Sequence, residues 1–176
     1  MNKTIISYSL TGNNEAFATR LANEINANHI RVSEPGKRKM GKIVSDSLLN
    51  RAPKIVFDPD AITKDDFVLF VGPVWLGKIA SPLRSCFKQL AGKEFPYAFI
   101  SVSGGADGPD CNDMVAGELS KQVGRDPVFF LDLHKADLLP PEPEPTRDMT
   151  MDYHINENDL DALVESALPV LQSNIG

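Results

Sequence analysis

Short apolar runs alternate with amphipathic stretches along nearly the whole chain, and this alternation limits the possible folds more than any other feature. The apolar runs predict five strands, at residues 4–8, 29–32, 67–71, 97–102 and 128–133. Stretches with helical spacing of apolar residues predict helices at 13–26, 37–48, 81–91, 110–123 and 156–168. Because the strands are apolar throughout, we expect a parallel sheet covered by helices on both faces. The prediction is a three-layer, doubly wound α/β fold.

The size and charge of the chain restrict its organisation and its partners. With 176 residues, of which 42% are hydrophobic, the chain can bury the core of one domain spanning residues 1–176. The formal net charge of −6 argues against a nucleic-acid-binding protein, which normally carries a basic patch. The sequence shows neither a secretory signal pattern nor an apolar stretch long enough for a membrane span, so we expect a cytoplasmic protein.

Prolines mark two irregular places near the carboxyl end. Residues 139–146 read LPPEPEPT, with four prolines among eight residues, so we expect a long loop near 136–155 before the last helix. Pro169 lies inside the apolar stripe of that helix and should kink or end it.

The two cysteines do not have the spacing of a metal site or the density of a disulfide framework. Cys86 shares a helical stripe with Leu83, Phe87 and Leu90, which predicts a buried structural thiol. No role is assigned to Cys111.

Three segments follow predicted strands and lead into predicted helices, and they are the candidate ligand-binding loops. In doubly wound sheets, ligands bind beyond the carboxyl ends of the strands, where the strand order reverses. We call residues 9–14 loop one, residues 72–78 loop two and residues 103–110 loop three.

Loop one has the composition of an anion site. Ser9, Thr11, Gly12, Asn13 and Asn14 supply hydroxyl, amide and backbone N–H groups at the start of a helix, where the helix dipole favours negative charge. The loop has no lysine or arginine, which fits the phosphate monoester of a mononucleotide better than a triphosphate with its magnesium ion. The alternative is that these side chains only cap the helix.

Loop two resembles a triphosphate-binding loop in spacing but not in chemistry. Gly72, Gly77 and Lys78 match G-x-x-x-x-G-K, but Ile79 stands where a hydroxyl should bind magnesium. Pro73 removes a backbone donor, and Trp75 places a large ring where small residues normally admit phosphate. We therefore disfavour this interpretation.

The sequence SLTGNNE, residues 9–15, resembles the phosphate loop S/T-x-T-G-N-T-E of flavodoxins, with Asn14 in place of the usual threonine. Residues 72–90, which contain GPVW-x-G and the following helix, are similar to the second loop of that family, and the order of elements matches across nearly the whole chain. The resemblance implies a flavodoxin-like strand order 2-1-3-4-5 and an FMN cofactor, with the phosphate in loop one and the isoalloxazine ring at loops two and three.

The resemblance assigns a role to each loop. Loop one would hold the phosphate through the five residues named above. The ring would be positioned on one side by Pro73, Val74, Trp75, Leu76, Gly77 and Lys78, and its edge would be contacted by Ser103, Gly104, Gly105 and Ala106. Trp75 would stack on the ring rather than fill the core, and Gly77 would permit a backbone change near flavin N5. Lys78 either lies near flavin N1 or faces solvent.

These features predict an FMN-binding redox protein that transfers electrons to a partner protein or a small-molecule acceptor, with no catalytic side chain of its own. An NAD(P)H-dependent quinone or flavin reductase is the alternative, because loop three lacks the aromatic residue that covers the second flavin face in many flavodoxins. This second face would be either open, as the reductase requires, or covered by another segment such as Tyr153 or by a second subunit. A flavodoxin-fold binding or regulatory module without FMN is the third hypothesis.

Other functional classes lack their sequence signatures. The three histidines, His29, His134 and His154, lie on separate elements and suggest neither a metal site nor a catalytic triad. The chain also lacks G-x-S-x-G, G-x-G-x-x-G and an acidic pair after the first strand. We therefore expect no hydrolase, dinucleotide-binding or phosphoryl-receiver domain.

Overall fold

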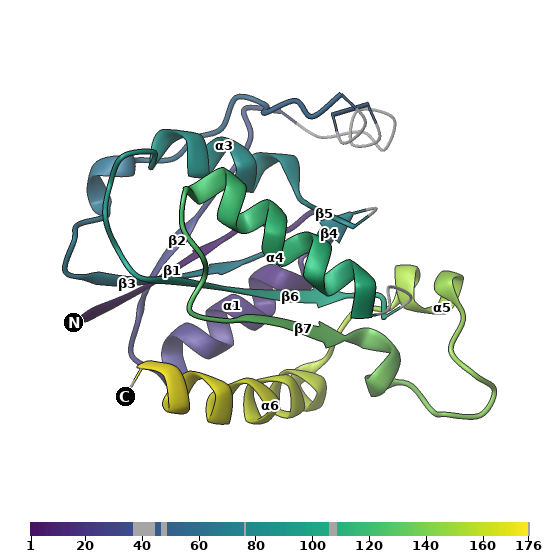
Figure 1. The fold of residues 1–176 in the computed structure, drawn as a ribbon. Coiled ribbons are helices and arrows are strands. Elements are labelled where there is room, and N and C mark those ends of the chain that lie inside the picture. The colour runs from purple at the N-terminus through teal and green to yellow at the C-terminus, as the bar shows by residue number, and fades with distance from the viewer. Residues whose placement is uncertain (37–44, 47–48, 76, 106–108, 176) are drawn as a thin grey trace.

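The centre of the protein is a five-stranded parallel sheet (Figure 1). The computed structural model describes all residues except 37–44, 47–48, 76, 106–108 and 176. The strands are β1 (Asn2–Ser7), β2 (Asn28–Arg31), β3 (Asp66–Val71), β6 (Tyr97–Ser103) and β7 (Phe130–His134). Their order in the sheet is β2-β1-β3-β6-β7, and every neighbouring pair is parallel. This confirms the predicted α/β class and the order 2-1-3-4-5.

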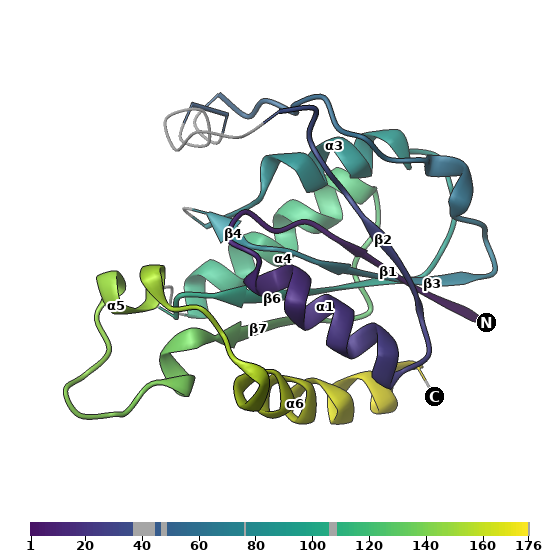
Figure 2. The ribbon, with the colours of Figure 1, turned by 180° about the vertical axis from the view of Figure 1, so that it is seen from behind.

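Helices cover both faces of the sheet (Figures 1 and 2). On one face, α1 (Asn13–Glu24) and α6 (Glu157–Ile175) pack over a core that includes Phe17, Leu21 and Leu163. On the other face lie α3 (Ser81–Gln89) and α4 (Pro109–Val123), with Phe87 and Leu119 in the core. The helix predicted at 37–48 falls mainly outside the described residues. None of the helices in the described part of the chain is long and apolar enough to span a membrane.

The central strand β3 explains why the sheet needs both layers. All six of its residues are buried, and alternate ones face opposite cores, with Leu69 on the side of α1 and Phe70 on the side of α3. Cys86 is fully buried in the second core, to which Phe70 also belongs, and this confirms the predicted buried thiol.

The strand register places the carboxyl ends of four strands, β1, β3, β6 and β7, at one edge. Ser7 at the end of β1 lies opposite Val71 at the end of β3, and Val71 lies opposite Ile100 in β6. Ser103 at the end of β6 pairs with His134 at the end of β7. The loops that follow these strands therefore leave the sheet side by side.

Three local features differ from the sequence prediction. Loop two contains a short hairpin of β4 (Val74–Trp75) and β5 (Lys78–Ile79). The region 136–155 is not loop throughout, because η2 (Lys135–Leu138) and α5 (Arg147–Asp152) frame the irregular proline segment. A further single-turn helix, η1 (Pro59–Ala61), precedes β3. Both views place α5 and the hairpin at the same end of the sheet (Figures 1 and 2).

Of the two effects predicted for Pro169, a kink or an end of the last helix, the end is wrong. Helix α6 continues through Pro169 to Ile175. Proline removes one backbone hydrogen bond and crowds the preceding turn. Ala167 and Leu171, on either side of it, are buried against the sheet, so tertiary packing keeps the helix intact.

Candidate functional site

Loop one brings an uncapped helix end to the edge of the sheet. Gly12 is the N-cap of α1 and has a φ of 96°, a left-handed conformation that glycine adopts without strain. No side chain caps this helix within the described chain; instead, the N–H of Gly12 donates to Ser9 Oγ at 3.0 Å. The first backbone N–H groups of a helix have no acceptor within the helix. The start of α1 therefore offers donors to an anion, with the exposed Thr11 beside them.

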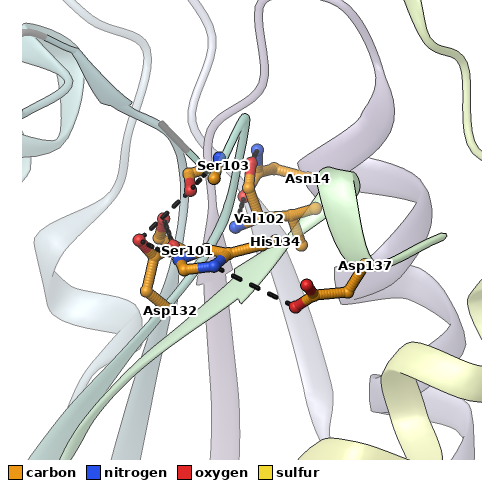
Figure 3. A network of polar contacts seen from close by, with 8 residues as sticks. Asn14, Ser101, Val102, Ser103, Asp132, His134 and Asp137 are labelled. Carbon is orange, nitrogen blue, oxygen red and sulfur yellow. Dashed lines mark hydrogen bonds and ion pairs between the residues drawn. The ribbon is translucent and has the colours of Figure 1, made fainter. Parts of the chain in front are cut away.

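The side chains of Asn13 and Asn14 are occupied elsewhere. Asn14 accepts from the N–H of Val102 at 2.9 Å and donates to its carbonyl at 3.0 Å, so it joins α1 to β6 (Figure 3). Asn13 donates to the carbonyl of Tyr153 at 2.8 Å and accepts from the N–H of Ile155 at 3.3 Å. Both amides are buried. Their predicted part in phosphate binding stays a prediction and depends on their backbone N–H groups.

Loop two presents Trp75 on the hairpin, next to loop one. Trp75 pairs with Lys78 across the two short strands, so the two side chains lie on the same side of the hairpin, and Gly77 turns the chain with a φ of 68°. The indole is half-buried and meets the ring of Tyr8 edge-to-face, with centroids 6.0 Å apart. Because Tyr8 leads directly into loop one, this contact brings loops one and two together. Leu76 lies outside the described residues.

Two charged side chains hold the base of the hairpin. The N–H of Ile79 donates to Glu118 Oε2 at 2.9 Å, and its carbonyl accepts from Arg84 Nε at 3.1 Å. Arg84 is fully buried and also lies 3.7 Å from Glu118 Oε1. Sequence reasoning missed both residues, although an arginine beside Leu83 in an apolar helix stripe signals a buried ionic contact.

Loop three rests on a polar network at the ends of β6 and β7 (Figure 3). Ser103 donates its hydroxyl proton to Asp132 Oδ2 at 3.1 Å and accepts the N–H of Gly105 at 3.3 Å. Ser101 donates to Asp132 Oδ1 at 2.6 Å, and His134 Nε2 lies 3.2 Å from Asp132 Oδ2. The predicted site residue Ala106 lies outside the described residues. Asp132 was missed, and its signal was an acidic residue within the apolar strand VFFLDL.

The segment around α5 closes against loops one and three. A Cβ placed on Gly104 would lie 3.1 Å from Thr150 Oγ1, and Thr150 is buried. Beyond α5, the chain is held to Asn13 through Tyr153. The Tyr153 hydroxyl donates to Asp159 Oδ2 at 2.8 Å, a bond that raises the pKa of the tyrosine and directs its hydroxyl to α6. The segment therefore reaches the site mainly through its backbone and through Thr150.

The structure therefore connects loop one both to loop two and to the strand that precedes loop three. Tyr8 and Trp75 join loops one and two, whereas Asn14 joins loop one to the strand that leads into loop three. The described residues contain no cluster of histidine, cysteine or acidic side chains that could hold a metal ion. A pocket of about 540 Å³ on the outer side of α1, between Thr19, Arg31 and Glu157, shares only Gly12 with the loops.

Comparison with known proteins identifies the fold. No protein-family model and no curated protein sequence matches the chain. A flavoprotein from Lactobacillus acidophilus NCFM, solved in complex with FMN, has a TM-score of 0.63 and 19% identity, covering 74% of this chain and 92% of its own. A candidate flavoprotein from Bacteroides eggerthii DSM 20697 has a TM-score of 0.60 and 11% identity, covering 94% and 96%. A flavodoxin from Streptococcus pneumonia TIGR4 has a TM-score of 0.51 and 12% identity, covering 98% and 99%. At these identities, the similarity establishes a flavodoxin-like fold.

Proposed function

We propose that this flavodoxin-like protein binds FMN and transfers electrons. The observation that carries the proposal is that an uncapped helix start, at Gly12, and a half-buried indole, Trp75, which contacts Tyr8 just before loop one, belong to loops at the same edge of the sheet. The helix start favours the phosphate of a mononucleotide, and the indole favours a flat apolar ring. The FMN complex of the similar Lactobacillus protein supports the same cofactor.

The residues present fit FMN. The backbone N–H groups at the start of α1, with Ser9 and Thr11, would hold the phosphate monoester through neutral donors. Trp75 would lie along one face of the ring, and the backbone of loop three, from Ser103 to Gly105, would contact its edge. When bound, FMN supplies the electron-transfer chemistry. The chain would bind the cofactor, orient it and exclude water from one face.

A reductase using the same site is the second candidate. Ser103, Gly104 and Gly105 provide no aromatic cover for the second face of the ring, and the Tyr153 hydroxyl points toward α6. An open face would admit NAD(P)H and a quinone-like acceptor, whereas an electron carrier would meet a protein partner there. We place either activity in the cytoplasm, on the sequence features given above.

Titration of FMN into the cofactor-free protein tests the proposal. Trp75 is the only tryptophan of the chain, so its fluorescence should be quenched as the flavin ring stacks on it. We expect riboflavin, which lacks the phosphate, to bind at least about tenfold more weakly, since charge-assisted hydrogen bonds contribute about 1.5–3 kcal/mol each. Absence of FMN binding would refute the proposal and favour a binding module without cofactor.

Variants of Trp75 test the stacking role separately. Trp75→Ala should weaken FMN binding by about fivefold or more, equivalent to roughly 1 kcal/mol of lost ring contact. Trp75→Phe keeps an aromatic ring and is the matched control, with a smaller loss. Flavin fluorescence is the measurement for both variants, because neither contains tryptophan. Equal affinities in wild type and both variants would place the ring away from Trp75.

Turnover separates the two candidates. Steady NAD(P)H oxidation in the presence of a quinone would favour the reductase. Stepwise uptake of two electrons at well-separated potentials, without NAD(P)H turnover, would favour the carrier.

A further inference from the structure

A buried carboxylate lies directly beneath loop three and is shared by three side chains (Figure 3). Asp132 has only 4% of its side chain exposed. Ser101 occupies Oδ1, and Ser103 and His134 occupy Oδ2, at the distances given above. Of these three partners, His134 is the one whose charge changes near neutral pH.

Carboxylates face both nitrogens of the His134 ring. Nε2 lies 3.2 Å from Asp132, and Nδ1 lies 4.0 Å from Asp137 on η2. A protonated imidazole carries a donor on each nitrogen and matches both carboxylates, whereas a neutral imidazole carries only one. Gain or loss of one proton therefore changes the contacts of His134 with its neighbours.

His134 reaches loop three by two routes. A Cβ placed on Gly105 would lie 3.0 Å from His134 Cβ and 3.3 Å from Cγ, so the glycine, with a φ of 92°, packs directly on the histidine side chain. In addition, the N–H of Gly105 donates to Ser103, which in turn donates to the same Asp132 oxygen that faces His134. Protonation or deprotonation of His134 should therefore affect the backbone of Gly105, which is expected at the edge of the flavin ring.

We propose that His134 is a positioning residue that links proton binding to the redox state of the flavin held by loop three, an inference that rests on the proposed function. An external reductant would supply two electrons to the bound flavin, which would also take up one proton and so gain one net negative charge, and the imidazole of His134 would take up a second proton from solvent. The added negative charge favours the protonated histidine, and by reciprocity the protonated histidine favours reduction. The midpoint potential of the flavin should therefore become more negative as pH rises through the titration of His134.

Other charges belong to the same corner of the protein. Asp132 faces His134 from β7 and Asp137 from η2. Lys135, next along the chain, is buried, and this burial lowers its pKa, while Asp152 of α5 acts in the opposite direction. Lys135 and Asp152 stay unchanged in the variants below, so differences between the variants and wild type isolate the histidine network.

The test is the midpoint potential of the FMN-loaded protein measured against pH from about 5 to 9, with dithionite as the reductant. In wild type, we expect the plot of midpoint potential against pH to change slope where His134 titrates. His134→Gln keeps a donor for Asp132 but cannot ionise, so this change of slope should be absent from its plot. His154→Gln is the matched control, because His154 is exposed on the chain beyond α5, and it should retain the change of slope. Identical pH profiles for wild type and His134→Gln would overturn the inference.

Asp137→Asn gives a second measurement if the glutamine variant folds poorly. The Asp137 side chain is 80% exposed, so this substitution should leave the fold intact. The Asp137 carboxylate favours the protonated imidazole, so its loss should move the change of slope in the plot of potential against pH to lower pH. A change of slope at the same pH as in wild type would contradict the role given to His134 and its carboxylate neighbours.

An NMR titration of the cofactor-free protein separates the two proposals. The amide signal of Gly105 should shift with the ring signals of His134 in wild type and not in His134→Gln. Failure of FMN to bind would refute the proposed function, whereas FMN binding without a titration of Gly105 would refute only the role of His134.

Discussion

The buried amide of Asn14 is predicted to contribute strongly to stability, because it fixes loop one to β6. Its amide is 3% exposed and makes two hydrogen bonds to the backbone of Val102. Asn14→Ala removes both bonds and leaves a buried N–H and a buried carbonyl without their partner, at about 1–3 kcal/mol for each group left unpaired. Alanine's better helix propensity returns about 0.5 kcal/mol, and water entering the space reduces the penalty. We expect a net loss of about 3 kcal/mol.

Urea unfolding measures this loss. With a slope of about 2 kcal/mol per molar urea, the midpoint of Asn14→Ala should fall by about 1.5 M. Asn23→Ala is the matched control, because Asn23 is exposed on the same helix and its replacement should change stability by less than about 0.5 kcal/mol. A midpoint shift below about 0.5 M with an unchanged slope would refute the role assigned to Asn14.

Asn14→Asp extends the same experiment to pH. The new carboxylate can accept from the N–H of Val102, but its second oxygen faces the carbonyl of Val102 and repels it. The folded state should therefore raise the pKa of this aspartate above its unfolded value. The destabilisation should be greatest at neutral pH and should diminish, relative to wild type, as the pH falls toward about 4.

Three further predictions concern other parts of the fold. Burial raises the pKa of the Cys86 thiol, so iodoacetamide should leave Cys86 unmodified in the native protein and label it in urea, as followed by mass spectrometry. Burial, and then Arg31, lower the pKa of His29 below 6.5, so the stability that neutral His29 provides should be lost as pH falls from 7 to 5, and His29→Gln should flatten that part of the unfolding profile. Glu118→Ala leaves the N–H of Ile79 without its acceptor and should lower the free energy of unfolding by about 2 kcal/mol, whereas Glu118→Gln keeps an acceptor and should lose less.

The sequence predicted the sheet well because its strands are buried on both faces. A strand such as β3, with every residue inside, requires a continuous apolar run, and such runs are visible without coordinates. The hairpin β4–β5 was missed because each of its strands has two residues, too few for any periodicity. Helix α5 was missed because its six residues, RDMTMD, follow a proline segment and carry no apolar stripe.

The residues of the candidate site stay a prediction, and the contacts of their side chains could not be read from the sequence. A polar side chain at the end of a strand can serve a ligand or the protein itself, and the sequence does not distinguish the two. Asn13 and Asn14 show this, since their partners lie 140 and 88 residues away along the chain. The same limit hid Asp132, two of whose three partners, Ser101 and Ser103, come from the neighbouring strand β6.

These internal bonds have a consequence for binding that the family resemblance alone does not reveal. A loop that must be ordered by its ligand spends part of the binding free energy on that ordering. Here Asn14 fixes loop one to β6, Tyr8 supports Trp75, and Ser103 holds the start of loop three, all through contacts within the protein. In the proposed site, the Asn14 side chain would therefore not bind the phosphate but would hold in place the loop that offers the backbone donors. The binding energy of the phosphate would then depend on how well the helix start is held in place rather than on the number of side chains that touch it.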